Sequence, residues 1–436
     1  MKKSEFKKRR KQLMQRIGKG NIALIGSAST QTRNRDVDYP FRQDSDFYYL
    51  TGFNEPEAMA VFIPGREQGE YILFCREFDE KKALWEGAHA GLEGATHHYD
   101  ADDAFPIDDL NDILPGLLEG KTRVHYPMGR DSELDHNLLA WINHIRSQSR
   151  TGAVAPGELV SLELILHEMR LFKSSYELQL MRRAAEVSAN AHVKAMQICK
   201  PGLFEYQVEA ELVYQFMQNG LRAVAYPSIV ACGKNACTLH YTENTSQLKK
   251  GELLLIDAGA ECDHYAADIT RTFPVSGRFS EPQKLLYQLV LDAQFAAIEA
   301  VKPGASWIQP HDAAVQVLTQ GLVKLGLLKG RVKHLINKEK YKAFYMHRTG
   351  HWLGMDVHDV GVYKIDDEWR TLTPGMVLTV EPGLYIPPDC KTVDEQWRGI
   401  GIRIEDDVLV TAEGNEVLTH GVPKTIADIE ALMQAN

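Results

Sequence analysis

The chain is 436 residues long, carries a net charge of −10, and is 44% hydrophobic and 25% charged. This composition is typical of a soluble globular protein with room for two or three domains. The negative charge argues against nucleic acid as the main partner. No apolar run is long enough to span a membrane, so we expect no membrane partner. The six cysteines lie far apart without a CxxC pair, which argues against a cysteine zinc site and favours free thiols in the cytoplasm.

The first third of the chain predicts an α/β region. Its basic start is followed at once by Gly18, Lys19 and Gly20 rather than by an apolar segment, so we interpret it as an amphipathic helix and not a targeting signal. Short apolar runs bounded by turn residues predict strands at residues 21–26, 47–52, 59–64 and 71–75. Helical patterns cover residues 107–118 and 134–145.

A change of domain is expected near Lys173. A loop of small residues at 151–157 comes before it, and Ser174 with Glu177 forms a capping box for a long helix after it. We therefore expect an N-terminal domain over residues 1–173 and a second domain over residues 174–436.

The second domain repeats one pattern. Lys-Pro-Gly at residues 200–202 and again at 302–304 lies between two helical stretches, which favours two related halves. The N-terminal domain shows no catalytic constellation. Its Trp85 could face a substrate, although a lone tryptophan is more often in the core.

Two aspartates flank a predicted hairpin at residues 253–273. If the chain turns at Cys262 and Asp263, then Asp257 and Asp268 lie opposite each other on one face, with Cβ atoms about 5 Å apart. One alternative is a pair of exposed acids beside a turn. Because Asp257 directly follows the apolar run 253–256, we favour a buried pair with a cation between the carboxylates.

Further acids and histidines occur in apolar surroundings downstream. Glu381 is the one charge on an apolar strand, and Glu405 follows another, which is costly unless each carboxylate is paired or ligated. His347, His351 and His358 lie within twelve residues, and His240 precedes the hairpin. A structural role is the alternative for any single histidine.

Four carboxylates and at least one imidazole predict two divalent cations. An oxygen-rich set without thiolates favours manganese, and cobalt or zinc could also enter. Two such ions about 3.5–4 Å apart hold a bridging hydroxide, polarise a carbonyl and stabilise the oxyanion. The sequence therefore predicts hydrolysis at an acyl or phosphoryl centre.

At this point the chain resembles the pita-bread metallopeptidases, and within them aminopeptidase P. The resemblance rests on DFYYLTGF (46–53), HWLGMDVHDVG (351–361), VEPGLYI (380–386) and RGIGIRIEDD (398–407), and it covers nearly the whole chain. It implies an α/β (α+β) protein. A creatinase- or prolidase-type α/β domain would precede a pita-bread catalytic domain of two pseudo-symmetric halves.

The resemblance also implies residue roles. One metal would bind Asp257, the other His351 and Glu381, while Asp268 and Glu405 would bridge both. Glu381 would accept and pass on the proton of the attacking water. The other implied roles are contacts to the scissile amide and oxyanion from His358 and His240, and a proline pocket lined by His347, Tyr385 and Arg403. Trp85 would match a tryptophan that a neighbouring subunit contributes in tetrameric members.

The implied reaction is removal of one N-terminal residue from peptides with proline in second position. A homodimer or homotetramer is expected. The alternatives are an Xaa-Pro dipeptidase (prolidase), which shares the five ligands, and a non-catalytic pita-bread binding module or a metal-free creatinase-like hydrolase, which would have lost them. One departure from the family pattern is Arg348-Thr349, where small residues are more usual, and a cation there could alter peptide preference.

Overall fold

The computed structural model describes residues 2–435 and divides the chain into two compact units, Met1–Met169 and Arg170–Asn436. The division falls close to Lys173, where we expect the change of domain. Each unit has its own sheets and is described by itself. Within residues 2–435, no helix combines the length and the apolar character that crossing a membrane requires.

The first unit is built on a six-stranded mixed sheet with the order β6-β5-β4-β1-β7-β8. Strand β1 pairs antiparallel with β4 and parallel with β7. The strands are β1 (Asn21–Gly26), β4 (Met59–Phe62), β5 (Tyr71–Cys75), β6 (Asp103–Pro106), β7 (Arg123–Tyr126) and β8 (Glu158–Ser161). A separate short pair is formed by β2 (Thr32–Asn34) and β3 (Val37–Asp38).

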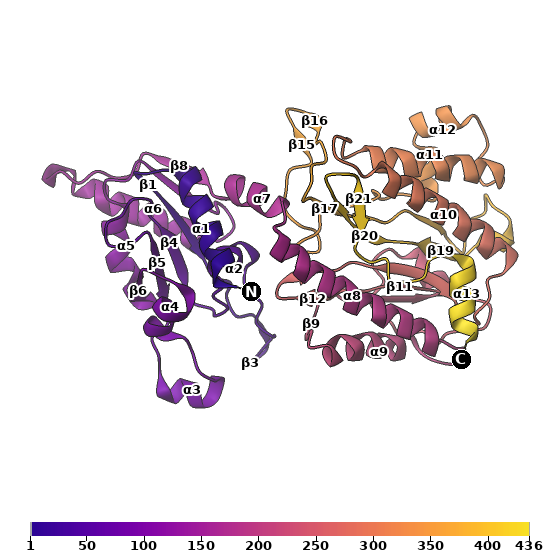
Figure 1. The fold of residues 1–436 in the computed structure, drawn as a ribbon, viewed down its shortest axis with the longest axis horizontal. Coiled ribbons are helices and arrows are strands. Elements are labelled where there is room, and N and C mark those ends of the chain that lie inside the picture. Colours follow the sequence, from indigo (N-terminus) through magenta and orange to yellow (C-terminus); the bar gives the residue numbers. More distant parts are fainter. Residues whose placement is uncertain (1, 436) are drawn as a thin grey trace. The chain divides into compact units, whose positions relative to one another are not determined.

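Helices cover the two faces of this sheet (Figure 1). Leucines of α5 (Leu110–Leu118) and α6 (Ser132–Ser147) join Ile22, Leu24 and Val124 in one buried cluster. On the other side lie α1 (Lys3–Ile17) and α2 (Ser45–Thr51), which contact each other and β1. The unit also contains α3 (Glu80–Glu86) and α4 (Gly91–Tyr99).

The predicted strand at residues 47–52 is wrong, because this segment belongs to helix α2. Asp44 caps the helix by accepting a hydrogen bond from the backbone N–H of Phe47 at 2.9 Å, and Gly52 ends it with a left-handed φ of 67°. Every residue of α2 is buried. A segment that is apolar on all sides shows no helical period, so its sequence does not distinguish a buried helix from a buried strand.

The second unit contains two helix pairs, each followed by strands, as the repeated pattern predicts. The first pair is α8 (Ser175–Ile198) and α9 (Glu205–Gln218), and the second is α10 (Glu281–Ala300) and α11 (Gln309–Lys324). The capping box is present, since Ser174 Oγ accepts from the Glu177 N–H at 3.3 Å and a Glu177 oxygen accepts from the Ser174 N–H at 2.9 Å.

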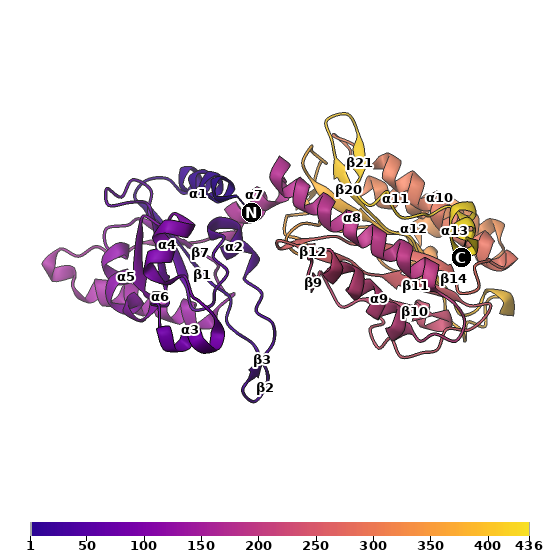
Figure 2. The same cartoon turned by 60° about the horizontal axis from the view of Figure 1, so that its bottom comes forward.

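Several strands of the second unit lie between its two helix pairs in Figure 1, and Figure 2 shows the same unit turned by 60° about the horizontal axis. They form several small sheets, with the orders β10-β11-β14, β17-β20-β21 and β18-β19. Their bounds are β10 (Ile229–Cys232), β11 (Leu253–Asp257), β14 (Thr270–Pro274), β17 (Val377–Val380), β18 (Gly383–Ile386), β19 (Ile400–Arg403), β20 (Asp406–Val410) and β21 (Asn415–Val417). Helix α7 (Glu163–Leu171) crosses the division between the units, and α12 (Val332–Asn337) and α13 (Ile426–Gln434) complete the set of longer elements.

The predicted register of the aspartate hairpin is wrong by two residues. Asp257 lies opposite Thr270, not Asp268. The chain turns at Asp263 and His264, whose φ values of 46° and 70° are those of a tight hairpin turn with two left-handed residues. Between the main strands, β12 (Ala260–Cys262) and β13 (Tyr265–Ala266) pair with each other and join β9 (Ala223–Val224) in a separate small sheet.

A buried ion cluster anchors the loop that carries His358. Asp359 accepts from Arg170 at 2.6 Å and from Lys173 at 2.9 Å, and all three side chains are almost fully buried. Burial alone would raise the pKa of Asp359, but the charges of Lys173 and Arg170 hold it below its ordinary value. An added Cβ at Gly354 would collide with this carboxylate, so the position requires glycine.

We expect Asp359→Asn to lower the free energy of unfolding by about 3–5 kcal/mol, because it removes the buried counter-ion of Lys173 and the buried one of the two carboxylates that bind Arg170. Asp356→Asn is the matched control. Asp356 accepts from the same Arg170 at 2.8 Å, but its side chain is 37% exposed, so its loss should cost less than about 1 kcal/mol. Chemical denaturation of both variants measures the difference, and equal losses would contradict this account.

Candidate active site

Most of the predicted site residues line one cavity of about 630 Å³ in the second unit. They are Asp257, Asp268, Glu381, Glu405, His240, His347, His351, His358 and Arg403. Tyr385 lies directly behind this lining and contacts both His347 and Arg403.

The four carboxylates reach the cavity from the ends of strands. Asp257 ends β11, Glu381 follows β17, Asp268 precedes β14, and Glu405 lies between β19 and β20. Backbone hydrogen bonds fix the two glutamates: the Glu381 N–H donates to the Thr349 carbonyl at 2.7 Å, and the Glu405 N–H donates to the Thr270 carbonyl at 3.0 Å. Segments far apart in the sequence thus present acids to one point.

Two hydroxyl groups hold the carboxylates in place. Tyr226 Oη lies 2.7 Å from Asp257 Oδ1 and 2.6 Å from Asp268 Oδ1, so the two aspartates meet through one phenol despite the shifted register. Thr270 Oγ1 donates to Glu405 Oε2 at 2.6 Å. Since a phenol has one proton, it can donate to only one of the two carboxylates at a time.

Without a bound metal, the cluster of carboxylates and His351 holds protons near neutral pH. Burial raises the pKa of Glu381 to about 7 and raises the pKa values of Asp257 and Glu405 as well, with the neighbouring carboxylates adding to the effect. Burial would lower the pKa of His351, but its hydrogen bond to Asp268 and the charge of Glu381 raise it to about 9. The same imidazole lowers the pKa of Asp268 against the effect of burial.

His351 is oriented as a metal ligand. Its Nδ1–H donates to the Trp352 carbonyl at 2.9 Å, which leaves Nε2 facing Asp268 Oδ2 at 3.5 Å and Glu381 Oε1 at 3.6 Å. Fixing one ring nitrogen in this way is how proteins present the other to a metal. Ligand atoms of Asp268, His351 and Glu405 all lie within 4.8 Å of one another, so these residues fit a divalent cation.

A hydrogen-bonded chain leads from the carboxylates to the side of the cavity. Arg403 Nη2 donates to Asp257 Oδ2 at 2.5 Å, and its Nη1 donates to Tyr385 Oη at 3.0 Å. Tyr385 Oη lies 2.9 Å from His347 Nε2, and His347 Nδ1 donates to the Arg348 carbonyl at 2.7 Å. Burial and the charge of Arg403 lower the pKa of His347 to about 3, so Nε2 accepts the tyrosine proton.

The remaining predicted residues differ in their surroundings. The ring of His358 packs edge-on against His351 with centroids 4.4 Å apart, and burial followed by the His351 charge lowers its pKa. His240 is an exposed lining residue. Trp85 belongs to the first unit, on α3, and is 90% exposed, so its interpretation as a core residue is wrong.

Comparisons with known proteins agree with this geometry. The chain matches the model of metallopeptidase family M24 over residues 179–412 and that of the aminopeptidase P N-terminal domain over residues 6–126. It is 45% identical to the Xaa-Pro aminopeptidase of Escherichia coli K12, covering 99% of this chain and 98% of that protein. The solved structure of aminopeptidase PepP from Pseudomonas aeruginosa is 59% identical, with a TM-score of 0.99 over 100% of this chain and 98% of that one.

The chain belongs to metallopeptidase family M24. It is a metallo-aminopeptidase in which an aminopeptidase P N-terminal domain precedes an M24 pita-bread domain, so the predicted fold class is confirmed. For an M24 protein, the oxygen-rich cluster is the place for divalent metal ions.

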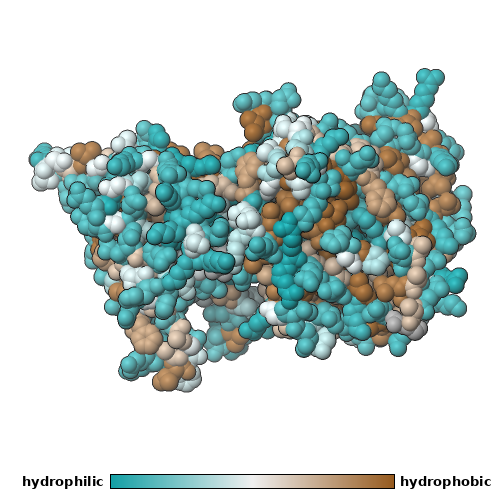
Figure 3. All heavy atoms as spheres, viewed as in Figure 1, coloured by the Kyte–Doolittle hydropathy of each residue, from teal (hydrophilic) through white to brown (hydrophobic). Residues whose placement is uncertain are grey.

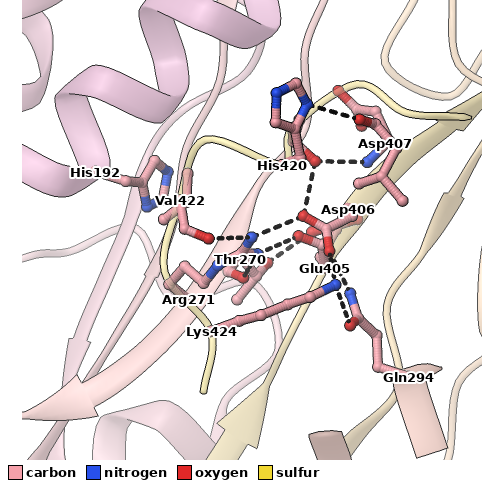
Figure 4. Close-up of polar contacts among 12 residues, drawn as sticks. His192, Thr270, Arg271, Gln294, Glu405, Asp406, Asp407, His420, Val422 and Lys424 are labelled. Atoms are coloured by element: carbon pink, nitrogen blue, oxygen red, sulfur yellow. Dashed lines mark hydrogen bonds and ion pairs between the residues drawn. The ribbon is translucent and has the colours of Figure 1, made fainter. Parts of the chain in front are cut away.

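A buried polar network supports Glu405 of this M24 site from behind (Figure 4). Arg271 donates through Nη1 to the Glu405 carbonyl oxygen and through Nη2 to Asp406 Oδ1, the latter at 2.7 Å. Lys424 and Gln294 donate to the other oxygen of Asp406, at 2.6 and 2.7 Å. Burial would raise the pKa of Asp406, but Arg271 and Lys424 lower it to about 2, which keeps it ionised.

A second network supports the segment between His347 and His351. Thr349 is 2% exposed, and its Oγ1 lies 2.9 Å from His311 Nδ1 and 2.6 Å from Tyr345 Oη. Its carbonyl accepts from the Glu381 N–H, so the same residue connects helix α11 to the strand end that carries Glu381.

Sequence reasoning missed these supporting residues. The search for charged residues in apolar segments did not identify four of them: Tyr226, Thr270, Thr349 and Asp406. The only signals were local: Tyr226 directly precedes Pro227, and Asp406 and Asp407 follow Glu405 just before an apolar run.

We expect metal affinity to fall as the pH is lowered. A divalent cation must displace the protons of Glu381 and His351, whose pKa values are about 7 and about 9. Both pKa values are raised in the metal-free protein, so the apparent affinity should increase as the pH rises toward 9 and drop steeply below 7. Calorimetric titration of chelator-treated protein with Mn²⁺ in buffers of different ionisation enthalpy measures the affinity and the protons released. An affinity unchanged between pH 6 and pH 8 would contradict this description of the cluster.

Proposed function

We propose that this M24 enzyme removes the N-terminal residue from peptides whose second residue is proline, with two divalent metal ions at the carboxylate cluster. The observation that carries the proposal is that three buried carboxylates, the partly buried Glu381 and His351 meet in one cavity beside the hydrogen-bonded series Arg403, Tyr385 and His347. The names of relatives support it, since the proteins of Escherichia coli and Haemophilus influenzae that match nearly the whole chain are both Xaa-Pro aminopeptidases.

Asp257, Asp268, His351, Glu381 and Glu405 would hold the two ions. Four carboxylates and one imidazole suit manganese, a hard cation, although a related structure described as zinc-substituted Escherichia coli aminopeptidase P supports exchange of the metal. When bound, such ions activate water as a nucleophile near neutral pH and polarise the scissile carbonyl.

The protein groups supply the proton transfers. Glu381, at the end of β17 beside His351, would accept a proton from the attacking water and return it to the leaving nitrogen. His358 has a lowered pKa and is neutral at pH 7, so it can donate an N–H to the developing oxyanion without adding a charge. We assign His240, which lines the same cavity, to the scissile amide.

We assign selection for proline to the three hydrogen-bonded residues Arg403, Tyr385 and His347. An Xaa-Pro bond has no N–H to offer, so a site that recognises a backbone donor is poorly suited to it. His347 lines the cavity and is held by Tyr385, Arg403 and Asp257, so its ring can accept a pyrrolidine by shape while Tyr385 supports it from behind.

We also propose a homo-oligomer that uses α3. Phe78, Leu84 and Trp85 are 55%, 86% and 90% exposed, and apolar atoms gather at this helix in the surface view (Figure 3). An exposed apolar group of this kind is typical of a contact surface. In a dimer or tetramer, Trp85 would approach the substrate of a neighbouring copy.

The six free thiols fit a reducing compartment, for which we propose the cytoplasm.

The test is release of free alanine from Ala-Pro-Ala, Ala-Pro and Ala-Ala-Ala by protein treated with chelator and then supplied with Mn²⁺. We expect cleavage of Ala-Pro-Ala to be lost on chelation and restored by metal, with little action on Ala-Ala-Ala. Cleavage of Ala-Pro alone would make the enzyme a prolidase. No cleavage of either proline peptide by protein with bound metal would overturn the proposal and favour a binding module.

A further inference from the structure

One cation at the edge of the active-site cavity has no role in the proposed reaction. Arg348 follows His347 and lines the same cavity as the metal ligands, and its side chain is exposed. A residue of this kind can act on the part of the substrate that extends out of the pocket.

The backbone of Arg348 is held firmly on both sides. Its carbonyl accepts the Nδ1–H of His347 at 2.7 Å, and the next residue, Thr349, is buried against His311 and Tyr345. The residue therefore keeps a constant place beside the His347 ring, and only its side chain is free to adjust.

The side chain is supported by an aromatic ring that it shares with a second cation. The guanidinium carbon lies 5.7 Å from the ring centre of Trp369, and the Lys364 ammonium lies 4.8 Å from the same ring. Both partners come from the short hairpin β15 (Lys364–Ile365) and β16 (Glu368–Trp369). Contacts of this type position a cation without neutralising it.

The charge of Arg348 is not cancelled by an ion pair. Within residues 2–435, no carboxylate lies within 4.0 Å of its guanidinium, although its charge acts at longer range on Asp312 and Glu339. Glu339 already pairs with Lys342 at 2.8 Å. By contrast, Arg403 inside the cavity is paired with Asp257. Arg348 therefore has no directly paired carboxylate, whereas Arg403 has one.

We infer that Arg348, supported by Lys364, selects for a carboxylate on the residue that follows proline in the substrate. The inference rests on the proposed function, which assigns proline to His347 and so brings the following residue toward Arg348. The carboxylate could belong to an acidic side chain or to the free C-terminus of a tripeptide, and both would meet the same charge.

The test compares kcat/KM for the amidated peptides Ala-Pro-Glu-NH₂ and Ala-Pro-Gln-NH₂, and for Ala-Pro-Ala with and without C-terminal amidation. The first pair reports an acidic side chain and the second reports the terminal carboxylate. For the unmodified enzyme we expect the acidic member of at least one pair to be favoured about two- to five-fold, the range of a partly exposed ion pair. A preference in one pair alone identifies the source of the carboxylate.

Variants locate the effect. Arg348→Gln should reduce the preference to about one, and Arg348→Lys should retain part of it. Lys333→Gln removes an exposed cation of α12 and is the matched control, for which we expect an unchanged ratio. Because each ratio is taken within one variant, a general loss of activity cancels.

A measurement on the unmodified enzyme keeps the test independent of variant folding. Raising the salt concentration from about 0.01 M to about 1 M shortens the Debye length from about 30 Å to about 3 Å, so the preference should shrink with salt. Equal rates for both members of both pairs, or a preference unchanged in Arg348→Gln, would overturn the inference. Cleavage of Ala-Pro-Gln-NH₂ shows in the same experiment that the proposed function itself holds.

Discussion

The second unit depends on one constraint: four carboxylates share one cavity, three of them buried and Glu381 partly so. Placing like charges this close is unfavourable unless protons or cations separate them. The raised pKa values of Asp257, Glu381 and Glu405 express that cost in the metal-free protein. In an M24 enzyme the same cost becomes the driving force for binding divalent cations, because ionised carboxylates then gain a partner.

Hydrogen bonds join acids of the cluster to residues of the other half of the domain, so the cluster also connects the two halves. Asp257, from the first half, pairs with Arg403 of the second half. Thr270 of the first half donates to Glu405 of the second, and Arg271 contacts the carbonyl of that glutamate. These crossings fix the ligand positions before any metal binds, which limits the reorganisation that binding requires.

The general plan could be anticipated from the sequence because charges in apolar strands are costly and therefore informative. That argument anticipated that Asp257, Glu381 and Glu405 come together, and the repeated Lys-Pro-Gly pattern anticipated the two helix pairs. Charge in apolar segments could not identify Tyr226 or Thr349 as supports of the site, because uncharged hydroxyl groups are common throughout proteins. The hairpin register failed because the two-residue turn at Asp263 and His264 required φ values that no glycine signalled. Helix α2 was taken for a strand because burial on every side removes the periodicity.

The central claim is that this cluster holds two divalent cations at once. Diffraction from crystals grown with Mn²⁺, recorded on both sides of the manganese absorption edge, tests it most directly. The account predicts two anomalous peaks between the carboxylates of Asp257, Asp268, Glu381 and Glu405, with His351 Nε2 bound to one of them. A single peak, or peaks only outside this cavity, would contradict it.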